Sequence, residues 1–215
     1  MRRHRKYLRV QNMLMPSALI AVALCITSAS AQEYDFRHTR WGMALEEVKA
    51  AESGPPDDEY SHGDVLLYKT MLLDEKVVVV YRFAFNKLVS ARYDLAKYTW
   101  YYWALFDPGA EINRTPAVIK GEFVGDFDKF KGELAQKYGQ PFDDKWVVKA
   151  GDTPKTKDAA GLDSLDAIVR SGRGGLYARW KTNRTDIALI VSGDGDLHFQ
   201  IVYSTRDSTY RRDGL

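Results

Sequence analysis

The stretch that decides the fold is Asp64–Leu95, DVLLYKTMLLDEKVVVVYRFAFNKLVSARYDL. It predicts three short strands joined by two tight turns, one at Asp74-Glu75-Lys76 and one at Asn86-Lys87. One side of the middle strand is formed by alternating apolar residues: Val77, Val79, Tyr81, Phe83 and Phe85. The other side is formed by Val78, Val80, Arg82 and Ala84. Because both sets are largely apolar, the pattern predicts a middle strand that is mostly buried and becomes polar only near its end.

A second stretch has the same outline. Gly175–Ser204, GLYARWKTNRTDIALIVSGDGDLHFQIVYS, predicts three strands with turns at Asn183-Arg184 and Asp194-Gly195. Each stretch comes after a helical pattern, so helix and strands recur in the same order. We therefore predict an α+β fold of two tandem helix-plus-three-strand (αβββ) units with antiparallel sheets, packed through those sheets.

The two helices differ in strength. Ala44–Ser53 has a weak apolar stripe and is ended by Gly54-Pro55-Pro56. Ala44 cannot act as a side-chain cap, which predicts a loss of about 1 kcal/mol of helix stability. After this helix, Asp57–Gly63 is expected to be a polar loop. The second helix, ending at Lys137, has a clear stripe of Phe127, Phe130, Leu134 and Tyr138.

These patterns predict four segments along the chain. They are a signal peptide (1–31), a first unit (32–96), an aromatic-rich linker (97–121) and a second unit (122–215). The second unit is expected to carry a loop insertion at about 142–175, in which Asp143–Val148 has the pattern of a short strand. Trp41, Trp146 and Trp180 are each expected in the core.

The N-terminus predicts export. A basic front of five residues precedes the apolar run Met13–Ile26, and Ala29-Ser30-Ala31 is typical of a signal-peptidase site. Cleavage at about Ala31/Gln32 would deliver the chain to the periplasm, with no stable membrane insertion afterwards. The alternative is a retained N-terminal anchor, although the apolar run is short of the ~20 residues of a comfortable membrane span.

Removing this segment changes the charge of the protein. Residues 1–31 contain five of the 31 Lys and Arg residues and none of the 29 Asp and Glu residues. The mature chain would have 26 basic against 29 acidic residues, a net charge of −3. No basic footprint then argues for a nucleic-acid partner. Cys25, the single cysteine, leaves too, so the fold must be held by its core without a disulfide.

An aromatic cluster comes after the first strand stretch, within Lys97–Pro108. Its members form the candidate binding surface of the sequence: Trp100, Tyr101, Tyr102, Trp103 and Phe106. One interpretation is packing between the two units, since aromatic side chains bury large areas. The other is a stacking platform or a membrane-contacting patch.

Motifs for chemistry are weak throughout. His38, His62 and His198 lack converging ligands, so no metal site is predicted. The glycines at Gly172-x-Gly174-Gly175 lead into a strand and open no helix, so no phosphate-binding cofactor site is predicted. No nucleophile turn is present, and acid pairs such as Asp143-Asp144 sit beside turns. The sequence therefore nominates no catalytic residue and favours a protein that is not an enzyme.

Several short motifs resemble a group of uncharacterised exported bacterial proteins. They are Trp41-Gly42-Met43 with Glu46-Glu47-Val48-Lys49, Lys137-Tyr138-Gly139-Gln140-Pro141, and Trp180-x-Thr182-x-x-Thr185-x-Ile187-x-Leu189. Ala44 departs from the Ser or Thr of that group. The element order is also similar to the small modules of outer-membrane assembly lipoproteins and to the two tandem units of the β-lactamase inhibitor protein. The resemblance implies an architecture and assigns no functional residue.

Three hypotheses of function remain open. The first is a periplasmic, non-catalytic binding module of the cell envelope, which holds an envelope protein or other periplasmic partner on a concave sheet face or on the aromatic cluster. The second is a hydrolase of an envelope polymer that uses two carboxylates about 5–10 Å apart. The third is a structural protein tethered to the inner membrane through its retained N-terminus.

Overall fold

The structure is a computed structural model, and it describes residues 34–60, 64–99, 102, 105–106, 123–148, 169, 172, 174–193 and 197–210. The chain divides into two units, Met1–Glu33 and Tyr34–Leu215, and all described residues lie in the second. The elements, in chain order, are α1 (Leu45–Ala51), β1 (Asp58–Tyr60), β2 (Val65–Leu72), β3 (Glu75–Ala84), β4 (Lys87–Leu95), η2 (Ala96–Tyr98), α3 (Phe123–Tyr138), β5 (Asp143–Val148), β6 (Gly174–Lys181), β7 (Thr185–Ser192), β8 (His198–Thr205) and η4 (Ser208–Tyr210). The fold is mixed α and β, with strands dominant.

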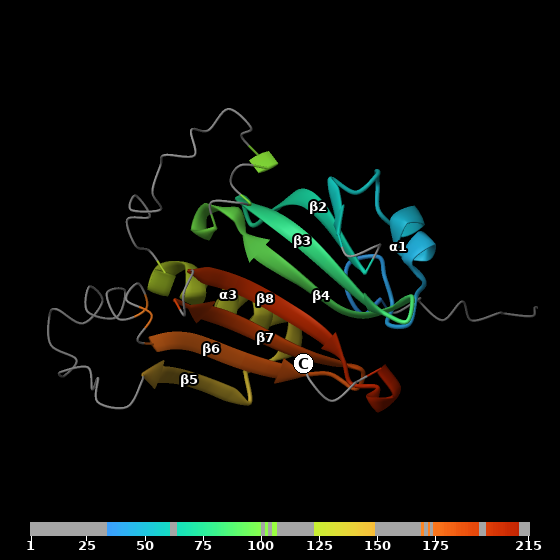
Figure 1. The fold of residues 1–215 in the computed structure, drawn as a ribbon. Coiled ribbons are helices and arrows are strands. Elements are labelled where there is room, and N and C mark those ends of the chain that lie inside the picture. The colour runs from blue at the N-terminus through green and yellow to red at the C-terminus, as the bar shows by residue number, and fades with distance from the viewer. Residues whose placement is uncertain are drawn as a thin grey trace, which may run out of the picture. The chain divides into compact units, whose positions relative to one another are not determined.

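All eight strands form one antiparallel sheet in the order β1-β2-β3-β4-β8-β7-β6-β5 (Figure 1). We call α1 to β4 the first half and α3 to β8 the second half. The prediction of separate sheets is corrected, because β4 and β8 pair edge to edge and join the halves in one sheet. The central register sets Arg92 opposite Val202. Pairing between strands this far apart in sequence leaves no local signal in either strand.

Both hairpin turns of the first half lie one residue earlier than predicted. Leu73-Asp74 joins β2 to β3, and Phe85-Asn86 joins β3 to β4. All four residues have positive φ angles, which in chain order are 49°, 66°, 52° and 57°. Two-residue hairpin loops favour this geometry because its twist matches that of the strands. Phe85 therefore leaves the buried side predicted for it and is 69% exposed.

The first helix obtains its cap from a distant residue. The Leu45 amide donates a hydrogen bond to Asn86 Oδ1 at 3.1 Å, and the Ala44 amide donates to Glu47 Oε2 at 2.6 Å. Two amide groups at the start of the helix are thus bonded by the β3–β4 turn and by the helix itself, although no side chain of the N-cap residue bonds the helix. The loop predicted at Asp57–Gly63 is also corrected, since Asp58–Tyr60 forms the edge strand β1.

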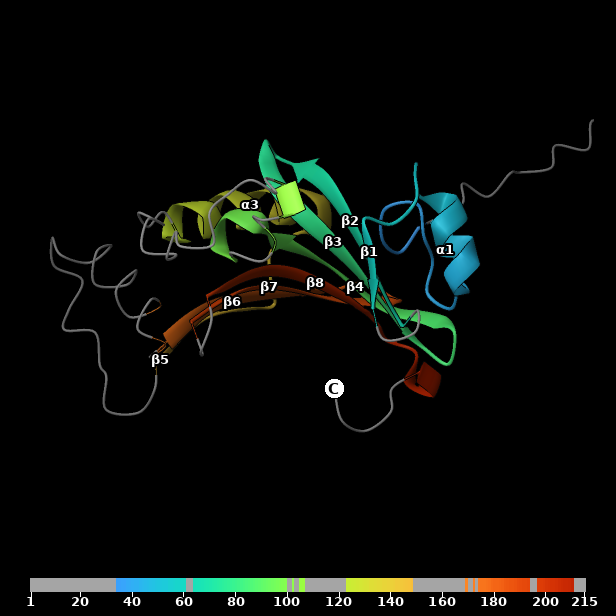
Figure 2. The same ribbon diagram turned by 45° about the horizontal axis from the view of Figure 1, so that its top comes forward.

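Both helices pack on the same face of the sheet, which we call the inner face (Figure 1, Figure 2). The α3 stripe is buried as predicted, with Phe127, Phe130 and Leu134 in the core. The predicted inward residues of the last three strands are buried there too: Leu176, Ala178, Trp180, Ile187, Leu189, Val191, Ile201 and Tyr203. Burial of this apolar area is the main stabilising term of the fold.

The three tryptophans predicted to lie in the core differ in burial. Trp41 and Trp180 are buried, and Trp180 Nε1 donates a hydrogen bond to the Gly139 carbonyl at 2.8 Å. Trp146 is 41% exposed, so its placement in the core was wrong. The reason is strand order: β5 has the bounds predicted for it, but it lies at the edge of the sheet, where fewer neighbours cover a side chain.

Candidate functional site

The described part of the aromatic cluster lies on the opposite side of the sheet, which we call the outer face. Tyr102, Leu105 and Phe106 pack against Leu67, Val78 and Val80 of β2 and β3. The three strand residues are at most 3% exposed, whereas Tyr102 and Phe106 are half-buried. Trp100, Tyr101 and Trp103 lie outside the described residues. In the first half, this segment therefore serves as a cover for the outer face.

A polar network borders that cover. Arg92 Nε donates to Asp94 Oδ2 at 2.9 Å, and Arg92 Nη2 lies 3.5 Å from the Tyr102 hydroxyl oxygen. Burial raises the pKa of Asp94, although the Arg92 guanidinium opposes this shift. Burial also raises the pKa of Tyr102 to about 12, helped by the Asp94 charge. Tyr102 thus stays neutral at physiological pH and ties the covering segment to β4.

The outer face of the second half is less covered. Its residues alternate with the buried inner set and are half-buried or exposed: Tyr177, Arg179, Asp186, Ala188, Ile190, Val202 and Ser204. We call this set the open face. It combines apolar groups with charges of both signs.

Two depressions mark the open face. One of about 340 Å³ is lined by Arg179, Lys181, Asp186, Ala188 and Val202 with four neighbours. The other, of about 210 Å³, is lined mainly by apolar atoms around Gly175. A Cβ atom at Gly175 would lie 2.6 Å from the Val191 carbonyl oxygen, so close packing of the strands excludes a side chain there.

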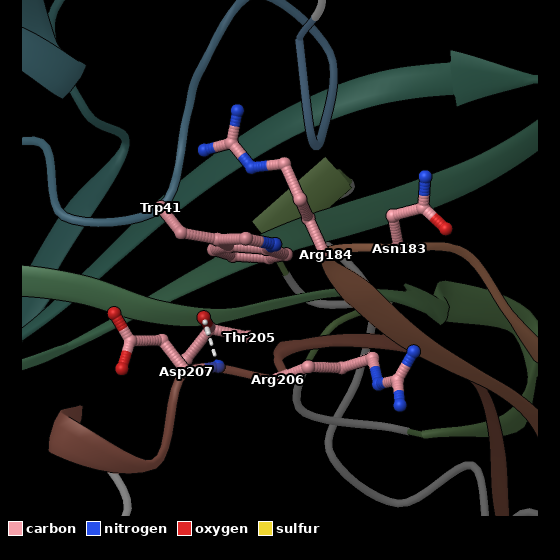
Figure 3. A pocket seen from close by; sticks show the side chains of 6 residues that line it. All are labelled: Trp41, Asn183, Arg184, Thr205, Arg206 and Asp207. Atoms are coloured by element: carbon pink, nitrogen blue, oxygen red, sulfur yellow. Dashed lines mark hydrogen bonds between the residues drawn. The ribbon is translucent and has the colours of Figure 1, made fainter.

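A third pocket, of about 330 Å³, lies where the first half meets the end of β8. It is lined by Trp41, Asn183, Arg184, Thr205, Arg206 and Asp207 (Figure 3). Trp41 Nε1 donates to Thr185 Oγ1 at 2.9 Å, a buried bond between residues 144 positions apart. Asp35 accepts a hydrogen bond from the Trp41 amide and forms an ion pair with Arg184, both at 2.9 Å. This pocket therefore surrounds a connection between the halves.

The two arginines of this pocket do not form an anion clamp. Figure 3 shows their guanidinium groups pointing in different directions. Arg184 pairs with Asp35, while Arg206 donates to the Thr182 carbonyl at 2.7 Å and lies 3.7 Å from Asp186 Oδ1. Their charges are thus engaged by the protein. We interpret the Trp41 pocket as a structural clasp, which sequence reasoning missed even though both of its motifs had been singled out.

A buried ion pair lies under α1. Arg37 Nε and Nη2 each donate to the Glu52 carboxylate at 3.0 Å, and the Tyr81 hydroxyl also bonds to Glu52. Burial lowers the pKa of Arg37, but the charge and hydrogen bonds of Glu52 together with Tyr93 and Tyr81 outweigh this, and the net pKa is raised. Burial raises the pKa of Tyr81 strongly. No residue pattern in the sequence marks Glu52 for this role.

Lys49, Lys97 and Lys131 each pair with two acids, and the two acids at Lys97 are the most buried of these. They are the described pair to compare with the two carboxylates of a hydrolase. Lys97 Nζ lies 2.6 Å from Asp126 Oδ2 and 3.0 Å from Glu75 Oε1, so one ammonium group sits between both carboxylates. Tyr98 also donates its hydroxyl proton to Asp126. Both carboxylates are thus engaged by one ammonium group, and Asp126 also by the Tyr98 hydroxyl. The cluster binds η2 to α3 and to β3 and faces none of the three pockets described above.

Within the ranges that the structure describes, no three His, Cys, Asp or Glu side chains gather closely enough to hold a metal ion. Among the helices of the same ranges, none has the length and apolar character needed to span a bilayer. Comparison of the chain with protein families, curated proteins and solved structures found no match.

Proposed function

We propose that this chain is an exported periplasmic interaction module that holds a partner protein of the cell envelope on the open face. It would be built from two tandem units of one helix and four strands, one strand more in each unit than the predicted αβββ pattern. The chain would act by binding and not by catalysis. We also propose that the chain is related to the exported bacterial group that it resembles. Two motifs of that group, Trp41-Gly42-Met43 and Trp180-x-Thr182-x-x-Thr185, meet through the Trp41–Thr185 hydrogen bond.

The register of the sheet supports the tandem plan. One row of directly paired residues crosses all eight strands: Asp58, Leu67, Val80, Arg92, Val202, Ala188, Arg179 and Asp143. Outward from the central Arg92–Val202 pair, the row crosses β3, β2 and β1 on one side and β7, β6 and β5 on the other. Strands at the same distance from the centre therefore have the same place in their halves. The row relates Val80 to Ala188 and Leu67 to Arg179. A twofold relation between the halves accounts for this match.

The chain around the row gives further support. Gly54 and Pro56 precede Asp58 by four and two residues, as Gly139 and Pro141 precede Asp143. In each half the residue before that aspartate donates its amide to the neighbouring strand, at 2.8 Å to Leu67 and 3.0 Å to Arg179. The helices differ in length, with 7 residues in α1 and 16 in α3. Duplication of one unit, followed by lengthening or shortening of the helix in one copy, would produce this pattern.

Export rests on the N-terminal pattern, with its basic front, apolar run and Ala29-Ser30-Ala31 ending. Intact-mass measurement of the protein isolated from cells tests this part. A mass that begins at about Gln32 supports cleavage. A mass that retains Met13–Ile26 would favour the tethered structural protein instead.

The binding proposal depends mainly on one observation: equivalent outer surfaces of the two halves are covered to different extents. Leu67 and Val80 are covered by Tyr102, Leu105 and Phe106, whereas their counterparts Arg179 and Ala188 lie on the open face. A half-apolar, grooved face beside charged groups is a surface on which a partner gains both buried area and orientation.

In-cell photo-crosslinking tests the proposal. A photoreactive residue replaces Arg179 on the open face or, as a matched control, the exposed Glu133 on α3. We expect a defined adduct with another protein from position 179 and none from position 133. Ala188→Arg should remove the adduct by filling the depression beside it. Equal adducts from both positions, or an adduct that survives Ala188→Arg, would reject the open face as the docking surface.

A further inference from the structure

Exposed apolar side chains concentrate on the last strand of the sheet. Phe142, Trp146 and Val147 are 55%, 41% and 48% exposed, and all lie on β5 or directly before it. Among the described strands β5 pairs with β6 alone, so its other edge carries backbone groups without a strand partner. The end of β5, Trp146-Val147-Val148, contains no charge and no proline. Such an edge is a template for another strand.

The opposite edge of the sheet has the features that prevent strand addition. β1 has three residues, and two of them, Asp58 and Glu59, are acidic. Glu59 forms an ion pair with Lys49 at 2.9 Å. Short, charged edge strands are a common protection against edge-to-edge association. The two edges are related by the row described above, so the difference between them concerns equivalent places in the fold.

The charges of β5 argue against a second copy of this chain as the occupant. Asp143 already pairs with Lys145 at 2.9 Å, and Asp144 with Lys131 at 3.2 Å. An antiparallel self-pair centred on Asp144 or Lys145 would set two like charges face to face. A self-pair centred on Trp146 would set Lys145 against Val147 of the other copy. A self-pair centred on Val147 opposes only apolar residues, but it would span just Trp146–Val148, because β5 ends at Val148. Like charges directly opposite destabilise a strand pair, and burial of a charge against an apolar group is costly.

We propose that β5 receives an extended segment of the partner protein as a ninth strand of the sheet. Backbone hydrogen bonds would supply affinity, and apolar or β-branched residues opposite Trp146 and Val147 would supply specificity. The charges at Asp143, Asp144 and Lys145 are matched within the chain, so the segment needs no charge opposite them. This inference rests on the proposed function and adds the edge of the second half to its open face.

Residue-level crosslinking in cells tests it. Photoreactive residues replace Lys145 and Val147 in separate variants, and the crosslinked positions on the partner are mapped by mass spectrometry. Because paired strands advance in step, we expect adducts to two positions of one partner segment that are two residues apart. Adducts scattered over the partner would overturn strand addition. Adducts to another copy of this chain would overturn the assignment to a different protein.

Blocking the edge gives the second readout. Val147→Lys places a charge on the exposed edge and should reduce the adduct from position 145 by about tenfold. Glu59→Lys on β1 is the matched control and should leave the adduct unchanged. Thermal unfolding of both variants checks that each is folded, and Trp146→Ser replaces Val147→Lys if that variant is not. An adduct from position 145 that persists after either change would overturn the inference.

The crosslink from position 179 separates this inference from the proposed function. If that crosslink persists while Val147 and Lys145 give no ordered pair of adducts, the partner binds the open face without adding a strand. If the crosslink from position 179 is absent as well, the proposed function itself fails.

Discussion

The middle strands β3 and β7 occupy matching places in the two halves, yet their outer residues meet different surroundings. Val78 and Val80 of β3 are buried beneath Tyr102, Leu105 and Phe106. Their counterparts by the same relation, Asp186 and Ala188 of β7, remain half-buried on the open face. On the inner face both strands contribute to one core. The halves thus share a scaffold and differ in how far their outer faces are covered.

That difference separates the part that holds the protein together from the part that is free to act. Apolar area is buried on both faces of the sheet at Leu66–Tyr68 of β2 and Val77–Tyr81 of β3. The second half keeps the inner layer, formed by α3, and presents polar and charged groups outside. A function located in the second half can therefore change with little loss of stability, while a change in the outer face of the first half is expected to disturb the fold.

Introducing a carboxylate at matched positions of the two halves should produce the largest difference in stability between them. Val80→Asp would bury an unpaired charge and should destabilise the protein by about 5 kcal/mol. Ala188→Asp lies at the equivalent place of the second half and should change the free energy of unfolding by about 0.5 kcal/mol or less. Urea unfolding of the two purified variants measures both values. Similar losses at both positions would mean that the two outer faces are equally buried.

Removing Arg37 should give the next largest effect. Arg37→Ala leaves the Glu52 carboxylate buried without its cation, and we expect a loss of about 3 kcal/mol. Lys49→Ala breaks the exposed pairs with Glu46 and Glu59 and should have a much smaller effect, because solvent screens exposed charges. Chemical denaturation compares the two. Adding Glu52→Gln to Arg37→Ala should recover part of the loss, and no recovery would show that the charge of Glu52 is not the cause.

Removing the Trp41–Thr185 hydrogen bond of the clasp should cause a smaller loss of stability. Trp41→Phe keeps an aromatic ring but removes the indole N–H that bonds to Thr185. We expect a loss of about 1 kcal/mol, the usual net value of one buried hydrogen bond, together with some lost packing. The double variant with Thr185→Val should be less destabilised than the sum of the two single variants. Simple additivity in this cycle would argue that the bond does not couple the halves.

The buried Asp94 predicts a pH dependence of the covered half. Its pKa is raised in the folded protein, so protonation favours the folded state. This contribution is present below the unfolded pKa and is lost as pH rises through the folded pKa. Relative to Asp94→Asn, the wild type should therefore gain stability as pH falls from 7 towards 4. Urea unfolding of both proteins at pH 7 and pH 4 measures the change in this stability difference. A wild type that loses stability relative to Asp94→Asn at pH 4 would contradict the prediction.

Local patterns predicted the elements that depend on near neighbours. The alternation of Val77, Val79 and Tyr81 placed β3 on the core, and the stripe from Phe127 to Leu134 placed α3 over it. The strand Asp143–Val148 has the bounds that the sequence indicated. In each case, the periodicity of a single segment carries the information.

Features that depend on distant pairing were not predictable in this way. The β4–β8 junction, the Asn86 cap of α1 and the Trp41–Thr185 bond each join residues whose proximity is fixed only by the completed sheet. The exposure of Trp146 is set by strand order, which periodicity does not encode. The open face was missed for the same reason, since its residues have the pattern of the polar side of ordinary strands until the covered counterpart is seen beside it.

Cysteine labelling tests the central claim most directly, because the only natural cysteine, Cys25, lies in the segment proposed to be removed. Val80→Cys and Ala188→Cys place one thiol at equivalent positions of the two outer faces. In the purified mature protein, a maleimide should react readily at position 188 and only after unfolding at position 80. In intact cells, docking of the partner should slow the reaction at position 188 by about tenfold, equivalent to about 1.4 kcal/mol. Equal reactivity at the two positions, or no protection of position 188 in cells, would contradict this account.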